Sequence, residues 1–197
     1  MPSLLDCLKT VEIFDPLGHY GQRAEMEFLV ELCWKANSGS PATVVEVGSY
    51  VGLSALCMAA AGHTVYCVDT FQGTVEDAQD ELGQTARKMR QTLGDGIVLD
   101  TFLKNTKDRL FKSIFPCVGE STLWAKRWPF PVDMVFIDAN HSYDSCLADI
   151  HGWRPHVKPG GILCGHDFGP FPGVERAVSH LLSDKFNVKE TIWWTQI

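Results

Sequence analysis

The stretch FIDANHSYD, residues 136–144, places two carboxylates, an amide and an imidazole directly after an apolar run. That run, residues 132–135, and the first two residues of the stretch together form Val132–Ile137, which has the length and side-chain types of a buried strand. Asp138 therefore follows the strand, and His141 stands three residues further on. Carboxylates bind hard cations and a neutral imidazole accepts a proton near neutral pH, so the stretch predicts a catalytic or metal-binding site.

A second polar pair, His166 and Asp167, follows the apolar residues 162–164. Ligands of parallel sheets bind beyond the carboxyl ends of the strands, so this pair should meet Asp138 if the two strands are neighbours. Three functions remain open for the cluster. In the first, Asp138, His166 and Asp167 hold a divalent cation such as Mg²⁺. In the second, His141 acts beside Asp138 as a general base without a metal. In the third, the side chains only cap the helix after residue 142 and tie down the loop 169–173.

A glycine-containing turn, EVGSYVG at residues 46–52, follows another predicted strand and precedes a helix. Its glycines let the backbone approach a ligand at a helix N-terminus. Tyr50 occupies the position where a dinucleotide-binding turn needs a glycine, which argues against NAD and an oxidoreductase. Asp69, 23 residues after Glu46, ends the next strand, where an acid can accept hydrogen bonds from ribose hydroxyls. Recognition of a ribose without a pyrophosphate suggests S-adenosylmethionine.

Short apolar strands and amphipathic helices alternate along the chain. We predict helices at about 22–36, 53–61, after 142 and at 174–182, and strands at 43–47, 64–68, 113–118, 132–137, 162–164 and 191–195. Pro116 marks the third strand as an edge or irregular strand, and KPGG at 158–161 predicts a type II turn before the fifth. This order indicates an α/β fold with a mostly parallel sheet covered on both faces.

Five motifs in this order, EVGSYVG, VYCVD, VGES, DMVFIDANHSY and VKPGGILCGHDF, resemble those of class I S-adenosylmethionine-dependent methyltransferases. The stretches IDANHSY and GGILCGHD resemble, more narrowly, the methyltransferase-24 domain family. The resemblance covers roughly residues 43–182. It implies a Rossmann-like, doubly wound, mostly parallel seven-stranded sheet with helices on both faces.

The resemblance also implies a role for each strand-end residue. It places Glu46 and Gly48 beside the methionine part of the cofactor, Asp69 on the ribose, and Glu120 and Ser121 beside the adenine. The cofactor-binding set is completed by Ser49, Gly52 and Asp138. Catechol-type O-methyltransferases bind a metal with acids at the ends of the same two strands; His166 replaces one of those acids, and His141 takes the place of their lysine base.

Composition limits the function classes. The 197 residues fit one domain, in which we expect residues 1–42 to form an N-terminal helical segment and possible lid, and residues 72–110 to form a helical insertion. The segment 14–20 and the polar residues 72–96 are candidate lids. A net charge of −7 argues against nucleic acid as a partner. We expect a cytoplasmic location, no membrane association and reduced core cysteines, and leave a homodimer open.

These observations predict an S-adenosylmethionine-dependent methyltransferase that O-methylates a small-molecule acceptor, either a sugar or a secondary metabolite. Catalysis is expected from His141 and Asp138, with or without a divalent cation at the strand ends. The alternative function is a non-catalytic protein of the same fold that binds a nucleoside or a partner protein.

Overall fold

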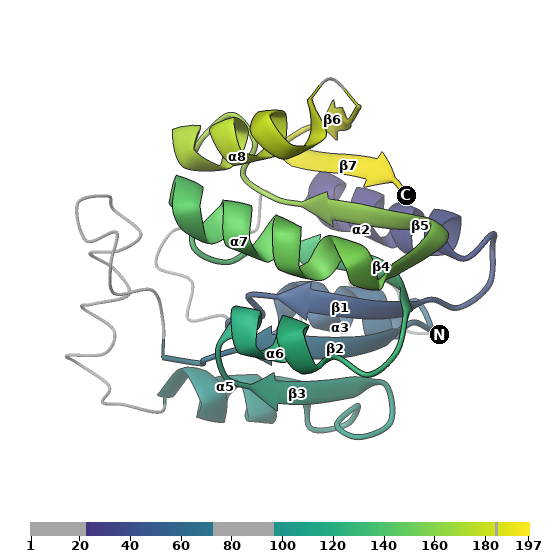
Figure 1. Ribbon diagram of the computed structural model, residues 1–197. Coiled ribbons are helices and arrows are strands. Elements are labelled where there is room, and N and C mark those ends of the chain that lie inside the picture. The colour runs from purple at the N-terminus through teal and green to yellow at the C-terminus, as the bar shows by residue number, and fades with distance from the viewer. Residues whose placement is uncertain (1–22, 73–96, 184) are drawn as a thin grey trace.

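The computed structural model describes residues 23–72, 97–183 and 185–197. Within these ranges one seven-stranded sheet carries helices on both sides (Figure 1). The elements are, in chain order, α2 (Arg23–Ala36), β1 (Thr43–Val47), α3 (Leu53–Ala60), β2 (Thr64–Asp69), α5 (Ile97–Thr106), β3 (Ile114–Val118), α6 (Ser121–Arg127), β4 (Val132–Ile137), α7 (Tyr143–Trp153), η2 (Arg154–His156), β5 (Val157–Gly165), α8 (Pro172–Leu182), β6 (Asn187–Lys189) and β7 (Ile192–Gln196).

The strands lie in the order β3-β2-β1-β4-β5-β7-β6. The five strands from β1 to β5 pair in parallel, whereas β7 is antiparallel to both β5 and β6. The predicted α/β fold with a mostly parallel sheet is confirmed, and so is the edge position of β3, which contains Pro116. Strand β6 was not predicted, because three exposed residues carry no alternating pattern.

The prediction that the fifth strand begins only after a turn at residues 158–161 is wrong. Strand β5 already begins at Val157, and KPGG is an irregularity inside it: Val132 pairs with Val157, but Met134 pairs with Ile162. Gly160 has a positive φ of 84°, and its N–H donates to the Ile197 carbonyl across the sheet. The proline and glycine signals mark a bulge, where they are also favoured.

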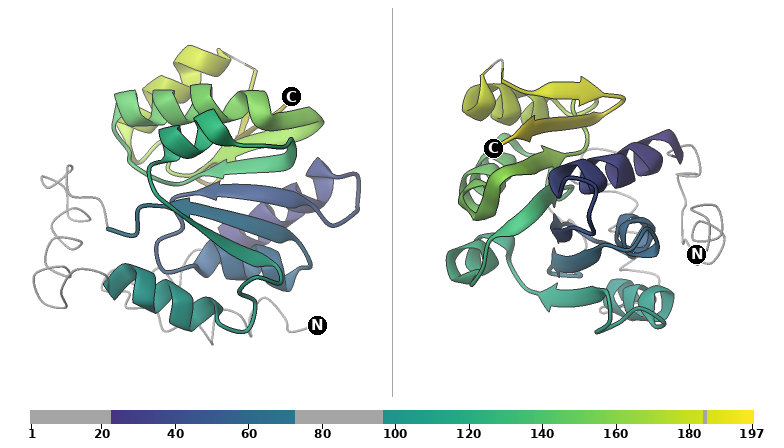
Figure 2. Two further views of the ribbon diagram at one scale, coloured as in Figure 1. Left: turned by 60° about the horizontal axis from the view of Figure 1, so that its bottom comes forward. Right: turned by 90° about the vertical axis from the view of Figure 1, so that its right-hand side faces the viewer.

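Two layers of helices enclose the sheet, as its edge-on view shows (Figure 2, right). Helices α2, α3 and α5 pack on one face around side chains such as Val44, Met134 and Ile162. Helices α6, α7 and α8 pack on the other face around Val45, Val135 and Leu163. Alternate residues of each central strand therefore face opposite cores, which explains why these strands read as continuously apolar.

Backbone hydrogen bonds hold the carboxyl ends of four strands level with one another. The N–H of Gly48 donates to Val68, that of Asp138 to Val47, and that of His166 to Ile137. Residues that directly follow β1, β4 and β5 are thereby placed side by side. The point between β1 and β4, where the strand order reverses, is the usual ligand-binding position in such sheets.

Six cysteines in the described part of the chain are free and buried, as predicted: Cys33, Cys57, Cys67, Cys117, Cys146 and Cys164. Among the described helices none is long and apolar enough to cross a membrane. The candidate lid at 14–20, the rest of 1–22 and residues 73–96 of the insertion lie outside the described residues. The described end of that insertion contains α5.

Candidate functional site

The turn after β1 brings the chain into close contact with the end of β4. Gly48 and Gly52 have φ values of 88° and 91°, a region that L side chains rarely adopt. Gly48 lies against the backbone of Asp138 and Ala139, and Gly52 lies against side chains of α5. Tyr50 also has a positive φ, 46°, and is partly exposed. The two predicted glycines thus serve close packing as well as turn geometry.

Glu46 is fully buried at the end of β1. Its Oε1 accepts a hydrogen bond from the Ser54 hydroxyl in the first turn of α3. Within the described residues its Oε2 has no hydrogen-bond partner, and neither has the buried hydroxyl of Ser49. Burial raises the pKa of Glu46 to about 7. Unsatisfied buried polar atoms are costly, so this pair fits a polar ligand group that completes their hydrogen bonds.

Asp69 holds the same turn from the end of β2. Its Oδ2 accepts from the backbone N–H groups of Ser49 (2.9 Å) and Tyr50 (2.8 Å), and its Oδ1 accepts from Phe71 (2.7 Å). The carboxylate predicted to bind a ribose therefore also orders the turn. Oδ2 thus uses both of its lone pairs, whereas Oδ1 can still accept one further hydrogen bond, because a carboxylate has about four lone-pair sites, two on each oxygen.

The two residues predicted beside an adenine differ in their surroundings. Glu120 is exposed and precedes α6, without capping it by its side chain. The Ser121 hydroxyl instead accepts from Trp153 Nε1 on α7 at 2.8 Å. Ser121 thus holds α6 against α7, whereas Glu120 remains directed to the surface.

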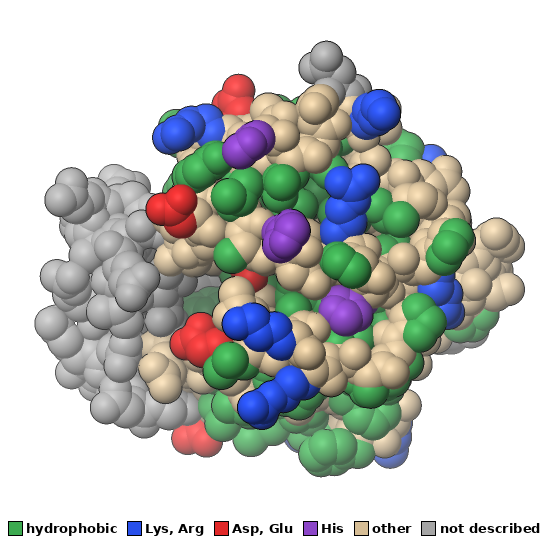
Figure 3. All heavy atoms as spheres, viewed as in Figure 1, with side chains coloured by type: hydrophobic (Ala, Val, Ile, Leu, Met, Phe, Trp, Pro, Cys, Tyr) green, Lys and Arg blue, Asp and Glu red, His purple; other side chains and the backbone are tan. Residues whose placement is uncertain are grey.

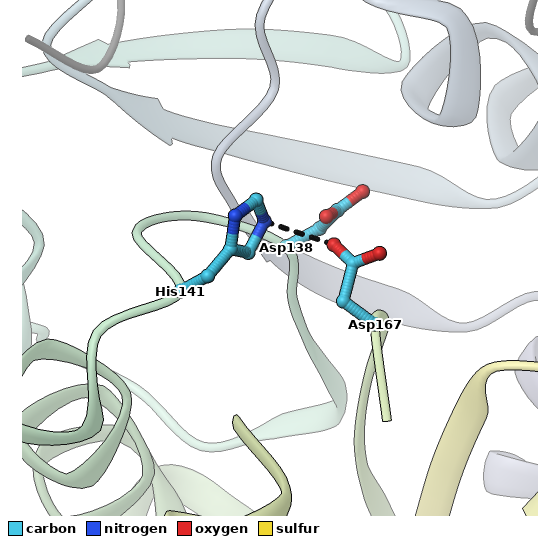
Figure 4. Close-up of side chains that lie close together, drawn as sticks. All are labelled: Asp138, His141 and Asp167. Carbon is cyan, nitrogen blue, oxygen red and sulfur yellow. Dashed lines mark ion pairs between the residues drawn. The ribbon is translucent and has the colours of Figure 1, made fainter. Parts of the chain in front are cut away.

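Asp138, His141 and Asp167 converge at the ends of β4 and β5 (Figure 4). His141 Nε2 lies 2.9 Å from Asp167 Oδ2, and one ligand atom from each of the three residues lies within 4.8 Å of the others. A divalent cation could be held by this set. The set shares Asp138 and Asp167 with the predicted metal site but contains His141 in place of His166.

The orientation of His141 is fixed from two sides. Its ring stacks on Phe171, with centroids 3.9 Å apart and planes 27° from parallel, while Asp167 holds Nε2. Asp167 has a φ of 66°, a strained value for a residue with a side chain. Gly173, at the start of α8, lies against the His141 carbonyl, where a Cβ would be only 2.2 Å away. Loop 169–173 therefore packs directly on the candidate base.

His166 is buried between three acids. Its Nδ1 lies 3.1 Å from Asp167 Oδ1 and 3.9 Å from Asp138 Oδ1, and its Nε2 lies 3.2 Å from Glu25 Oε2. The hydroxyl of Thr191 is 2.9 Å from the same Nε2. Both ring nitrogens are thus engaged by the protein.

The electrostatics of the cluster follow from these contacts. Burial alone would lower the pKa of His166, but the Asp138, Asp167 and Glu25 carboxylates outweigh it and raise that pKa to about 10. Burial opposes ionisation of Asp167, yet hydrogen bonds from His141 and His166 hold its pKa well below the usual range. Burial raises the pKa of Asp138 to about 6, although His166 acts in the opposite direction. The cluster combines a charged His166 with an ionised Asp167.

The helix-capping role considered for Asp138 is filled by other residues. Ser142 is the N-cap of α7, and its hydroxyl accepts from the Ser145 N–H at 3.3 Å. Asn140 Oδ1 accepts from the Ser142 N–H at 2.8 Å, as expected of a turn residue. The Asp138 side chain instead lies beside His141 and Asp167.

Four residues of the site were not singled out from the sequence: Glu25, Ser54, Phe171 and Thr191. For two of them a signal existed. Glu25 stands three, four and seven residues before the apolar Phe28, Leu29 and Leu32, so helical spacing places this acid on the buried face of α2. Ser54 follows the glycine turn at the N-terminus of a helix, where its hydroxyl can reach back to the preceding strand. Phe171 lies in a connecting segment without a periodic pattern, and Thr191, which the sequence placed at the start of the strand 191–195, lies in the turn before β7.

Charged side chains are interspersed on the face covered by α6, α7 and α8 (Figure 3). Lys and Arg do not form a continuous stripe among the described side chains of that face.

Comparisons with known proteins agree with this geometry. The family model Methyltransf_24, a methyltransferase domain, matches residues 45–168. Among solved structures, the calicheamicin methyltransferase CalS11 is 15% identical over 98% of this chain and 90% of its own, with a TM-score of 0.63. An apo structure of that enzyme is described as a TDP-rhamnose 3'-O-methyltransferase.

Two further structures are similarly distant. The O-methyltransferase NovP is 18% identical over 87% of this chain and 78% of its own, with a TM-score of 0.61. The SAH-bound methyltransferase PaMTH1 of Podospora anserina is 11% identical over 100% of this chain and 89% of its own, with a TM-score of 0.67. At these identities the similarity shows the fold alone, which is the Rossmann-like methyltransferase fold.

Proposed function

The chain belongs to the methyltransferase-24 domain family and is an S-adenosylmethionine-dependent methyltransferase; from this premise we propose that it methylates a hydroxyl of a small-molecule acceptor, with His141 as general base. The observation that carries the proposal is the contact between His141 and Asp167. A base held by an acid at the end of β5 stands next to the turn that would hold the methyl donor.

S-adenosylmethionine, when bound, supplies an electrophilic methyl group on a sulfonium centre. We assign the holding of this molecule to the predicted cofactor-binding residues. Glu46 Oε2 and the Ser49 hydroxyl can complete their hydrogen bonds on its polar groups, and Asp69 Oδ1 retains a lone pair for a ribose hydroxyl. Gly48 and Gly52 shape the turn, and Glu120 offers an exposed carboxylate near the end of β3.

The hydrogen bond to Asp167 determines which nitrogen of His141 acts as the base. An ionised carboxylate only accepts, so Nε2 carries the proton and Nδ1 has the lone pair. The acceptor hydroxyl gives its proton to Nδ1 as its oxygen bonds to the methyl carbon and the carbon–sulfur bond breaks. Asp167 then stabilises the resulting imidazolium. General-base catalysis of this kind contributes about 10²–10⁴-fold.

A sugar or secondary metabolite is the proposed acceptor class. The support comes from the sugar O-methyltransferase among the structural neighbours and from the absence of a continuous basic stripe on the described face of Figure 3. Soluble hydroxyl acceptors also suit a mechanism whose main demand is alignment of the acceptor oxygen with the methyl carbon.

Metal-assisted transfer is the second candidate, because Asp138, His141 and Asp167 form a three-ligand group. A cation there would polarise the acceptor hydroxyl, and a mixed nitrogen and oxygen set suits Mn²⁺ or Zn²⁺ better than Mg²⁺. If His141 binds a metal through Nε2, that nitrogen no longer donates to Asp167. The two mechanisms therefore predict different responses to chelation.

Calorimetric titration with S-adenosylhomocysteine and a methyl-transfer assay test the proposal. The acceptor panel consists of nucleotide-linked deoxysugars, free sugars and phenols, with S-adenosylmethionine as donor. Binding together with methylation of one class supports the proposal. Binding without methylation across the panel would favour the non-catalytic alternative, and no binding at all would reject the cofactor sites.

A further inference from the structure

Glu25 connects helix α2 with the candidate catalytic cluster, although it lies far from that cluster in sequence. Helix α2 packs beside β4, β5 and β7, and Glu25 is buried in its first turn. One of its oxygens accepts from the Thr191 hydroxyl at 2.5 Å, and the other lies 3.2 Å from His166 Nε2. One carboxylate oxygen thus contacts Thr191, which adjoins the His166 ring, and the other contacts the ring itself.

The directions of its hydrogen bonds define the protonation state of the His166 ring. The Thr191 hydroxyl has one proton, which it donates to Glu25, so it must accept from His166 Nε2 at 2.9 Å. At the other side of the ring Nδ1 faces an oxygen of Asp167 that can only accept, at 3.1 Å. Both ring nitrogens therefore carry protons, and the orientation of the ring is fixed at both ends.

The chain of contacts continues to the candidate base. Asp167 uses Oδ1 for His166 and Oδ2 for His141, at 3.1 and 2.9 Å. A carboxylate held through both oxygens cannot rotate without losing one of them. The orientation of His141 depends in this way on that of His166.

We infer that Glu25 is a positioning residue of the methyl-transfer site: together with Thr191 it fixes the His166 ring, which fixes Asp167 and through it His141. The inference rests on the proposed role of His141 as the base. Glu25 touches no reacting atom in this scheme. Its effect is on the geometry of the proton transfer, where small displacements are costly.

Two variants separate this role from simple folding support. Glu25→Gln keeps the shape of the side chain but turns a donor or a neutral oxygen towards His166 Nε2. Thr191→Val keeps the branched shape and removes the hydroxyl that joins Glu25 to the ring. Glu31→Gln is the matched control, because Glu31 lies on the same helix, is 68% exposed and pairs only peripherally with Lys189 at 3.6 Å.

Kinetics with the acceptor identified in the panel provide the first measurement. We expect both test variants to lower kcat by about 10- to 100-fold while the KM for S-adenosylmethionine stays within about twofold, and we expect the control to match the parent. A parent-like kcat in either test variant overturns the inference. An equal change in the control would also overturn it.

Long-range proton–nitrogen NMR of ¹⁵N-labelled protein provides the second measurement, which does not require catalytic turnover. The parent should show His166 with both nitrogens protonated and His141 protonated at Nε2. Glu25→Gln should alter the His166 and His141 signals, whereas Glu31→Gln should not; unchanged imidazole signals in Glu25→Gln reject the inference. If the protein methylates no acceptor but Glu25→Gln changes these imidazole signals, the proposed reaction is wrong, whereas the positioning of His166 and His141 by Glu25 is supported.

Discussion

Gly48 lies so close to Asp138 that no side chain fits between them. A Cβ at Gly48 would be 2.0 Å from the Asp138 carbonyl oxygen, and the φ of 88° is unfavourable for any other residue. The turn that would hold the cofactor is therefore packed directly on the strand end that carries the candidate catalytic cluster. Displacement of either one moves the other.

Gly48→Ala should destabilise the protein by several kcal/mol and abolish S-adenosylhomocysteine binding, because β1 and β4 would have to separate. Gly39→Ala is the matched control: its φ is 83°, but nothing lies within 4 Å of the added carbon. Strain alone should cost about 1–2 kcal/mol there. Urea unfolding compares the two, and equal losses would contradict the importance of the Asp138 contact.

Asp69→Ala should weaken S-adenosylhomocysteine binding and also lower the free energy of unfolding. The carboxylate accepts three backbone N–H groups, two of them in the glycine turn, and each lost charge-assisted bond costs about 1–3 kcal/mol. Calorimetry and urea unfolding measure the two effects. A variant with parent-like stability but no binding would show that Asp69 serves only the ligand.

Glu46→Gln should gain stability relative to the parent as the pH rises. The pKa of the Glu46 carboxyl is raised to about 7 in the folded protein, whereas in the unfolded chain this carboxyl has the ordinary pKa of about 4.5. Between those values only the folded state keeps the proton, so the parent loses stability with rising pH, by about 3 kcal/mol at most. The loss is complete above pH 7 and absent below 4.5.

Urea unfolding of parent and Glu46→Gln at pH 5 and pH 8 checks this expectation. Comparison of the two proteins cancels the slopes contributed by other acids with raised pKa values, such as Asp149. A difference for Glu46→Gln that is the same at both pH values would mean that Glu46 ionises normally.

His141→Gln should lower kcat by about 10²–10⁴-fold, because the proposed base is lost while the proposed cofactor-binding turn is untouched. Asp167→Asn should have an effect of similar direction, because an amide cannot stabilise the imidazolium. Affinity for S-adenosylhomocysteine should remain within a few-fold of the parent in both. Substantial turnover in His141→Gln would exclude His141 as the base.

Removal of divalent cations should leave the rate unchanged if His141 acts as the base. In that mechanism His141 Nε2 stays on Asp167 Oδ2, 2.9 Å away, and the positive charge between the acids comes from His166. Assays after EDTA treatment and after addition of Mg²⁺, Mn²⁺ or Zn²⁺ measure this. Loss of activity on chelation, restored by one of these ions, would establish the metal-assisted alternative.

The local pattern of the sequence determined the order of elements and the strand ends. Alternating apolar strands and helices predicted the parallel sheet, and Asp69, Asp138 and Asp167 were found because polar residues after apolar runs must lie at its carboxyl edge. Such features depend on residues adjacent in the chain, where periodicity and turn chemistry are visible.

Only the tertiary structure decided how these side chains are paired. The sequence grouped His166 with Asp138 and Asp167 as metal ligands, whereas packing turns the His166 ring between Asp167 and Glu25 and brings His141 to the other oxygen of Asp167. Glu25 reaches this site from a helix 141 residues earlier in the chain than His166. Contacts over such separations depend on how elements pack and on side-chain rotamers, which no local pattern encodes.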